Sequence, residues 1–360
     1  MAWEIVMGLE VHVELNTKTK IFCSCTTAFG GEPNTHCCPV CTGQPGSLPV
    51  LNKQVLEYAV KTGIALNCDI ARYNKFDRKN YFYPDLPKAY QISQLYLPFA
   101  RDGKVHITTA SGKEKDIRIH EIHMEEDAGK LVHSPFGDVS YPDYNRCGVP
   151  LLEIVSEPDF RSSEEVIAYL TKLKSTLKYL GVSDCKMEEG SMRADVNLSV
   201  REVGSETFGT RTEIKNINSF KAIERAIAFE AQRQIEALEF GERIVQETRR
   251  WDDNRSKTYS MRCKENAQDY RYFPEPDIPP IAIDEAMMQR LTEAQPEMAE
   301  AKQKRYMRDY GMSEKTAGIL TEEKHFAEIF ERTAALSGEP EETANWLIGH
   351  TIYLMGQHKI

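Results

Sequence analysis

The sequence lacks the short motifs that mark the common phosphate-binding and hydrolytic enzymes. Gly129-Lys130 has neither the upstream glycine nor the following Ser/Thr of a P-loop, and no G-x-G-x-x-G string occurs. His120-Glu121-Ile122-His123 does not have the H-E-x-x-H spacing of zinc proteases, and there is no G-x-S-x-G elbow. The chain is therefore not a common hydrolase or a P-loop enzyme.

Long apolar runs and targeting signals are also missing. No apolar run is long enough to span a membrane, and the N-terminus carries neither a basic n-region nor an Arg/Ser-rich transit peptide. We therefore expect a cytoplasmic protein with no membrane association. A length of 360 residues has room for two or three domains. The formal net charge of -10 argues against a protein that coats nucleic acid without sequence preference.

Cysteine is concentrated in one short segment. Five of the nine cysteines lie between Cys23 and Cys41, and such clustering in a cytoplasmic chain indicates metal rather than disulfides. Two cysteine pairs separated by a Gly/Pro/Asn-rich loop predict a structural Zn²⁺ site; the alternative is a loop with inert thiols. Because four sulfur ligands leave no open position, we expect this zinc to lie away from the chemistry. The predicted ligands are Cys23, Cys25, Cys38 and Cys41, which leaves Cys37 and His36 as spares.

An acidic run stands out at residues 120–130. It packs two histidines and four carboxylates into eleven residues, and we expect it to interrupt an alternating strand that contains Ile117 and Ile119. Carboxylates this close are tolerated when water, a cation or basic partners hold them. The simpler alternative is a solvated acidic loop.

Three other segments alternate with period two and place carboxylates opposite their apolar face. Glu10 lies beside His12, Asp195 beside Asn197, and Glu213 beside Lys215. The acidic run adds Glu125 and Glu126. If these strands share a sheet with that run, the groups converge on one face of the sheet. Oxygen ligands with one imidazole suit Mg²⁺ or Mn²⁺, an ion that can bridge ATP phosphates during phosphoryl transfer. The candidate catalytic residues are Glu10, His12, Glu125 and Glu126, together with Lys79 of the segment described next.

Residues 75–91 interleave cations, aromatic rings and prolines without a regular period. Such a segment can wrap a nucleotide or an RNA end, with bases on aromatic faces and phosphates on cationic side chains. Lys79, Tyr81 and Lys88 are its candidate cofactor-binding residues. An aromatic-rich packed loop is an equally good interpretation of this segment alone.

Helical patterns follow the strand-rich part and dominate the end of the chain. Capping residues and apolar stripes predict helices from Asn52 to about residue 66, from Ser162 or Ser163 to Gly181, and from Ser219 to about residue 238. From residue 284 onward strand-like alternation ends, and helices are expected over 284–294, 297–309, 313–336 and from Glu339 to the end.

Several long strings resemble one family of translation enzymes. The chain is similar to the B subunits of glutamyl/aspartyl-tRNA amidotransferases in segments that extend from Gly8 almost to its end. The matching segments include Gly8–Leu15, Phe76–Asp85, His123–Lys130, Asn145–Ile154, Tyr270–Asp277 and Ala344–Leu347.

The resemblance implies an α+β fold. An antiparallel β cradle with flanking helices is expected over residues 1–283, with the zinc-binding loop at about 23–41. A smaller all-helical domain is expected over 284–360, ending before a C-terminal tRNA-binding tail.

The resemblance also implies the reaction and the partners. The side-chain carboxylate of misacylated Glu-tRNA(Gln) or Asp-tRNA(Asn) is phosphorylated by ATP, and ammonia then displaces the phosphate. The ammonia comes from a partner amidase, the A subunit, and a small C subunit clamps the two larger subunits. By the family's pattern, Lys79 and Glu126 lie where an ammonia tunnel opens, and Mg²⁺ is surrounded by Glu10, His12, Glu125, Asp195 and Glu213.

Two other functions fit the same residues. One is a zinc-stabilised RNA-binding adaptor in which the acidic groups are only solvated. The other is a metal-dependent phosphohydrolase. ATP turnover that depends on Mg²⁺ and is stimulated by misacylated tRNA distinguishes the three, because the adaptor shows none and the hydrolase needs no charged tRNA.

Overall fold

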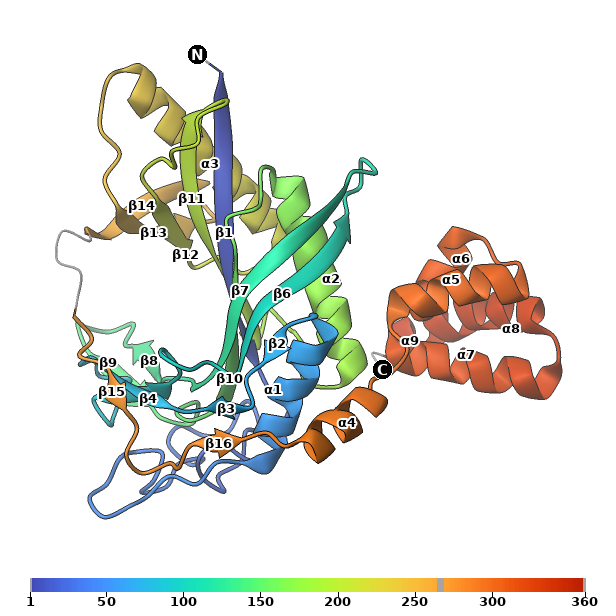
Figure 1. Cartoon of the computed structure of the whole chain (residues 1–360), viewed down its shortest axis with the longest axis horizontal. Helices are drawn as coiled ribbons and strands as arrows, with labels where there is room; N and C mark the ends of the chain where they lie inside the picture. The colour runs from blue at the N-terminus through green and yellow to red at the C-terminus, as the bar shows by residue number, and fades with distance from the viewer. Residues whose placement is uncertain (1, 264–268, 359–360) are drawn as a thin grey trace.

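A nine-stranded sheet forms the centre of the protein, which we describe from a computed structural model covering residues 2–263 and 269–358 (Figure 1). Neighbouring strands are antiparallel except β12 and β13, which are parallel, so the expected antiparallel cradle contains one parallel pair. Across the sheet the strands are β14 (Lys257–Cys263), β13 (Glu247–Asp252), β12 (Thr212–Lys215), β11 (Met192–Glu202), β1 (Trp3–Glu14), β10 (Pro150–Ser156), β7 (Glu114–Glu126), β6 (Ala100–Thr108) and β2 (Asp69–Ile70).

Three helices cover one face of this sheet and form its core with it: α1 (Lys53–Ala65), α2 (Ser163–Leu180) and α3 (Phe220–Glu239). Their ends follow the sequence signals. Ser162 accepts a hydrogen bond from the backbone N–H of Glu165 to cap α2, and Gly181 ends it at a φ of 69°. The expected helices of the first part of the chain are therefore confirmed.

The acidic run completes β7, contrary to the expectation that it interrupts this strand. Val155 pairs with Glu121 while the next residue, Ser156, pairs with Ile119, so His120 is the extra residue of a β-bulge. The bulge shifts the phase of the alternation. Ile122 and Met124 therefore join Ile117 and Ile119 in the core. His123 and Glu125, which alternate with them, face the other side of the sheet.

Small sheets and hairpins lie at the opposite face and at one end of the large sheet (Figure 1). β5 packs beside β7, which brings the aromatic segment close to the acidic run. The pairs are β15 (Phe273–Pro274), β4 (Asp77–Asn80) and β5 (Tyr90–Ser93) in one sheet, β16 (Ile281–Ala282) with β3 (Tyr73–Asn74), and β8 (Lys130–His133) with β9 (Ser140–Asp143).

The C-terminal helices build a second, smaller hydrophobic cluster around Tyr306 and Phe330. The first of them, α4 (Glu285–Glu293), instead places Leu291 in the core of the large sheet and packs on α1. The stretch expected as one helix over 313–336 is divided in two at residues 322–323. The remaining helices are α5 (Ala299–Tyr310), α6 (Glu314–Thr321), α7 (Lys324–Ser337), α8 (Pro340–Trp346), the π-helical η1 (Leu347–Thr351) and α9 (Ile352–His358).

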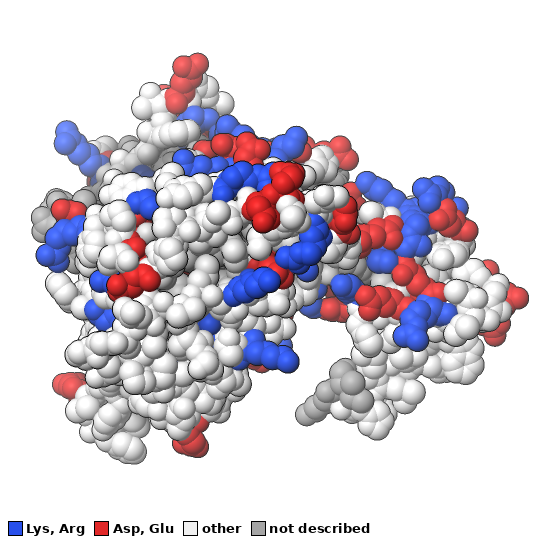
Figure 2. Space-filling view, turned by 60° about the horizontal axis from the view of Figure 1, so that its bottom comes forward, with Lys and Arg blue, Asp and Glu red and all other residues white. Residues whose placement is uncertain are grey.

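Acidic and basic side chains are interspersed over part of the C-terminal helices and the neighbouring surface on the face shown in Figure 2. This face is not the continuous basic surface of a protein that binds nucleic acid without sequence preference. Ion pairs of Lys172 with Glu300 and of Lys178 with Glu323 join α2 to the C-terminal helices. Among the described residues, no helix is both long and apolar enough to cross a membrane.

Candidate active site

The central strand β1 places Glu10 and His12 on the same face of the sheet. Leu9 and Val11, which alternate with them, are buried in the core on the other side. Glu10 lies opposite Asp195 of β11, and His12 lies opposite Glu153 of β10. One strand thus contributes to two groups of side chains, about 7 Å apart at the backbone.

The first group, cluster 1, consists of Glu10, Asp195 and Glu213, from β1, β11 and β12. One carboxylate oxygen of each lies within 4.8 Å of the others. Lys215 bridges two of them, with its Nζ 2.7 Å from Asp195 and 3.0 Å from Glu213. Burial, and then the charges of Glu153 and Glu213, raise the pKa of Glu10, which indicates a site short of positive charge.

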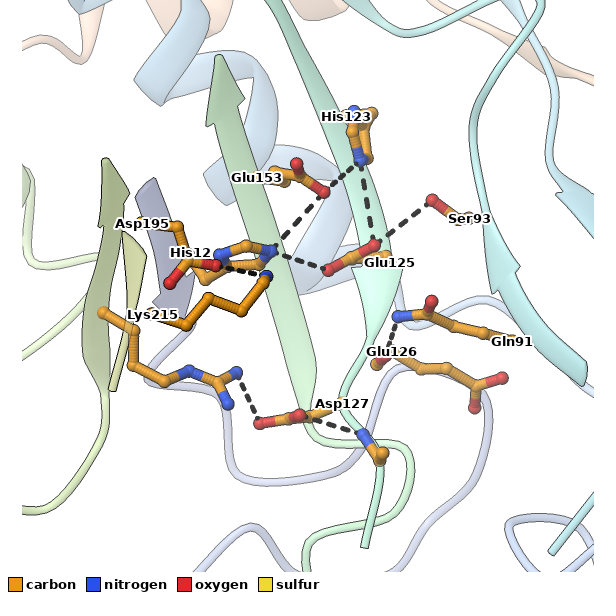
Figure 3. A network of polar contacts seen from close by, with 12 residues as sticks. His12, Gln91, Ser93, His123, Glu125, Glu126, Asp127, Glu153, Asp195 and Lys215 are labelled. Atoms are coloured by element: carbon orange, nitrogen blue, oxygen red, sulfur yellow. Dashed lines mark hydrogen bonds and ion pairs between the residues drawn. The ribbon is translucent and has the colours of Figure 1, made fainter. Parts of the chain in front are cut away.

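The second group, cluster 2, consists of His12, Glu125 and Glu153 (Figure 3). Nε2 of His12 lies 3.7 Å from Oε1 of Glu125 and 3.5 Å from Oε2 of Glu153. A second imidazole, that of His123, reaches the same carboxylates, at 2.9 Å from Glu153 and 3.7 Å from Glu125. These residues come from β1, β7 and β10, which are adjacent in the sheet.

Burial and charge act against each other in cluster 2. Burial raises the pKa of Glu153, but the charge of His123 and a hydrogen bond with His12 outweigh it and hold this pKa well below its usual range. Burial likewise lowers the pKa of His123, but Glu153 and Glu125 outweigh it and raise this pKa to about 10. A carboxylate this strongly stabilised as an anion is a good ligand for a cation.

The structure divides the metal set predicted from the sequence. Glu10, Asp195 and Glu213 meet in cluster 1, whereas His12 and Glu125 meet in cluster 2 with Glu153, which the sequence analysis missed. Glu153 lies in Leu151-Leu152-Glu153-Ile154, a run that indicates only a buried strand. The one available signal was its position opposite His12, which requires the strand order.

Glu126 faces a different site from Glu125, because consecutive residues of a strand point to opposite sides. Its carboxylate pairs with the buried amine of Lys88 and accepts a hydrogen bond of 3.0 Å from the backbone N–H of Ile92. Two of the predicted residues, Glu126 and Lys88, are thus brought together away from both clusters.

Lys79, at the end of β4, lies among aromatic rings. Its Nζ is 4.9 Å from the ring centre of Tyr270 and 5.8 Å from that of Tyr81. Burial, and then the charge of Glu125, raise the pKa of Tyr81, and burial followed by Glu125 and Glu153 does the same for Tyr272. This group of one amine and three rings, the aromatic group, therefore borders cluster 2.

The four predicted zinc ligands converge in the loop after β1. Sulfur atoms of Cys23, Cys25, Cys38 and Cys41, here called the cysteine cluster, all lie within 4.8 Å of one another. Cys38 and Cys41 are 4.0 Å apart, and sulfur atoms on a tetrahedral zinc are separated by about 3.8 Å. A hydrogen bond from Cys23 is the main cause that lowers the pKa of Cys41 to about 5. These residues fit a tetrathiolate zinc site.

The cysteine cluster does not lie away from the other predicted site residues. Cys23 and Cys41 line a cavity of about 200 Å³ that Lys88 and Glu126 also line. That zinc lies away from the chemistry stays a prediction, but the loop after β1 places the cysteine cluster beside Lys88 and Glu126.

A further cavity of about 230 Å³ opens beside cluster 1. Glu10 forms part of its wall, with backbone at Gly8, hydroxyls of Ser156 and Ser199, and the half-exposed ring of Phe208. Gly8 lines this cavity without a side chain, and an added Cβ would make ordinary contacts of 3.6 Å with the backbone of Ser156 and Pro158. Of these residues, only Glu10 was a candidate site residue from the sequence.

The fold and the clusters together define an α+β protein with carboxylate and imidazole groups on one face of a large sheet. The chain belongs to the family described as the GatB/GatE catalytic domain, which matches residues 5–289. It is 65% identical to the B subunit of the aspartyl/glutamyl-tRNA(Asn/Gln) amidotransferase of Agathobacter rectalis, over 98% of this chain and 74% of that protein. It is 58% identical to the protein of the same name from Caldicellulosiruptor bescii, over 99% of this chain and 74% of that protein.

Proposed function

We propose that this chain is the B subunit of a glutamine-dependent tRNA amidotransferase, a ligase that forms carbon–nitrogen bonds. It phosphorylates the side-chain carboxylate of Glu-tRNA(Gln) or Asp-tRNA(Asn) with ATP and replaces the phosphate with ammonia. The relatives' names give the reaction class. The observation that carries the proposal is the continuous row of cavity, cluster 1, cluster 2 and aromatic group across one face of the sheet.

Cluster 1 and its cavity suit the nucleotide. The ring of Phe208 offers a stacking surface, and the missing side chain at Gly8 lets a flat group lie against the backbone. The carboxylates of Glu10, Asp195 and Glu213 provide the oxygen ligands that Mg²⁺ or Mn²⁺ prefers. A divalent ion there would neutralise charge on the transferred phosphoryl group.

Cluster 2 suits the acceptor. His12 and His123 place two imidazoles against Glu153 and Glu125, which gives donors for a carboxylate or a phosphate and ligands for a second cation. His12 is two residues from Glu10 on β1, so donor and acceptor sites are held by one rigid strand. This arrangement fixes the approach of the two reactants.

Lys79 and Tyr81 border the acceptor side, where we propose that they contact the end of the tRNA or the incoming ammonia. Lys88 and Glu126 form a buried pair behind them and would line the path by which ammonia arrives. The ammonia itself would come from a partner amidase, with a small third subunit completing a heterotrimer.

The test is an assay of the three-subunit enzyme with ATP, Mg²⁺ and Glu-tRNA(Gln), with glutamine or ammonium as nitrogen source. Glu125→Gln keeps the shape of cluster 2 but removes charge, so it should abolish tRNA-stimulated ATP turnover. The glutaminase activity of the partner should persist. Amidation at the parental rate by Glu125→Gln would show that the site is wrongly placed.

The same assay separates the rival functions. ATP turnover without any charged tRNA would indicate a phosphohydrolase, and tRNA binding without ATP turnover would indicate an adaptor. Gln-tRNA formed from glutamine by this chain without the amidase would contradict the proposed division of labour.

A further inference from the structure

Lys20 is a fully buried cation beside the cysteine cluster. It lies in the loop after β1, and its side chain is 0% exposed. Its Nζ is 3.6 Å from Sγ of Cys41 and 3.5 Å from the carbonyl oxygen of Tyr144. Among the described residues, no carboxylate forms an ion pair with it. An ammonium group removed from water in this way is costly unless it has an anionic partner.

The cysteine cluster supplies the largest negative charge when it holds a metal. Four thiolates around a divalent ion leave an excess of negative charge on the sulfur atoms, which is larger than the charge of the metal-free cluster. A lysine that donates to one of the sulfurs then balances the site. The amine of Lys20 stands at the sulfur of Cys41, the most buried of the four cysteines.

The same lysine connects the cluster to the Lys88–Glu126 cavity. Gly148, at a φ of 80°, lies where the three meet: a side chain there would lie 3.5 Å from Cys41, 3.6 Å from Lys20 and 3.8 Å from Glu126. The backbone N–H of Ile21, the next residue, donates to the carbonyl oxygen of Gly148 at 2.9 Å. Lys20 and the cluster are therefore parts of one packed wall of this cavity.

We propose that Lys20 is the counter-cation of a zinc tetrathiolate at the cysteine cluster and fixes this centre as a wall of the Lys88–Glu126 cavity. Lys20 acts through Cys41 and is a positioning residue for the metal. This inference concerns metal binding alone and stands whether or not the proposed reaction is correct.

The test compares Lys20→Met with Lys20→Arg and with Lys18→Met. Methionine has nearly the same length without charge, arginine keeps the charge, and Lys18 is an exposed lysine of the same loop. Competition with a chelator of known affinity should show zinc binding about 10- to 100-fold weaker in Lys20→Met. Lys20→Arg should recover most of this loss, and Lys18→Met should bind as the parental protein does.

Two further readouts separate charge balance from simple packing. In the cobalt-substituted protein, Lys20→Met should shift the sulfur-to-cobalt charge-transfer bands, because Cys41 loses a hydrogen-bond donor. Lys20→Met should also lower the unfolding temperature of the zinc-loaded protein more than that of the zinc-free protein, because the zinc-loaded cluster carries the larger negative charge. Unchanged zinc affinity and cobalt spectrum, or an equal loss of stability with and without zinc, would overturn the proposal.

Discussion

The carboxylate of Glu153 lies 2.9 Å from Nε2 of His123, across the register that pairs β10 with β7. The same carboxylate also lies 3.5 Å from His12. Glu153 therefore holds both imidazoles of cluster 2 in place, and although burial lowers the pKa of each, the hydrogen bond and charge of Glu153 contribute to raising it.

Glu153→Gln should lower tRNA-stimulated ATP turnover by about 10- to 100-fold, because neutral glutamine orients the imidazoles less well and no longer supports their charge. The matched control is Glu157→Gln, which removes the partner of exposed His120 at 2.9 Å, another Glu–His pair of the same strand region. Equal activities of the two variants would contradict a role for Glu153 in the site.

Cys38→Ser should remove bound zinc and lower the free energy of unfolding by about 2 kcal/mol or more, because a structural metal contributes directly to folding. The rate of amidation with ammonium should change little by comparison. Elemental analysis and thermal unfolding measure the two effects. The neighbouring Cys37→Ser is the control, since Cys37 is outside the cysteine cluster; protein purified without chelator that contains no zinc would contradict the assignment.

Lys79→Ala should lower amidation about 10- to 100-fold with glutamine and with ammonium alike, because the amine among the rings of Tyr270 and Tyr81 lies on the acceptor side of the site. Lys130→Ala, which removes an exposed amine of β8, should leave both rates unchanged. A loss confined to glutamine would place Lys79 in ammonia delivery rather than at the acceptor.

Glu14 should give the protein a measurable pH dependence of stability. Burial, and then the charge of Asp127, raise the pKa of Glu14 to about 7 from a usual value of 4.5. The folded state then holds a proton that the unfolded state has released, so stability present below about pH 4.5 is lost as pH rises to about 7.

Glu14→Gln removes this loss, so its unfolding temperature should exceed the parental value by a margin that grows between pH 4.5 and 7 and is constant above. Glu202→Gln replaces an exposed carboxylate at the end of β11, and its unfolding temperature should follow the parental value at every pH. Parallel profiles for Glu14→Gln and the parental protein would show that the pKa of Glu14 is the same in the folded and unfolded states.

Local signals in the sequence predicted the elements well. The caps of α2 at Ser162 and Gly181 and the two faces of β1 depend only on neighbouring residues, and both are confirmed. The bulge at His120 was missed because the extra residue shifts the alternation of apolar and polar residues. The sequence pattern of β7 therefore stops where the strand in fact continues.

The division of the site into two clusters depends on the strand order, which the sequence does not show. Glu10 and His12 lie on one face of β1, which predicts a single cluster. They separate because the neighbouring strands on the two sides of β1 supply different partners, Asp195 from β11 and Glu153 from β10. Nothing local indicates which strands are adjacent.

The alternation of side chains along β1 also specifies its register with the neighbouring strands. A slip of β1 by one residue would turn Leu9 and Val11 toward the polar face and force Glu10 and His12 into the hydrophobic core. Misaligned chains are therefore penalised twice, by exposed apolar groups and by buried charge. The side chains proposed for the chemistry therefore also fix the strand register. An apolar replacement such as Glu10→Leu should make the pairing of β1 less specific as well as lower the reaction rate.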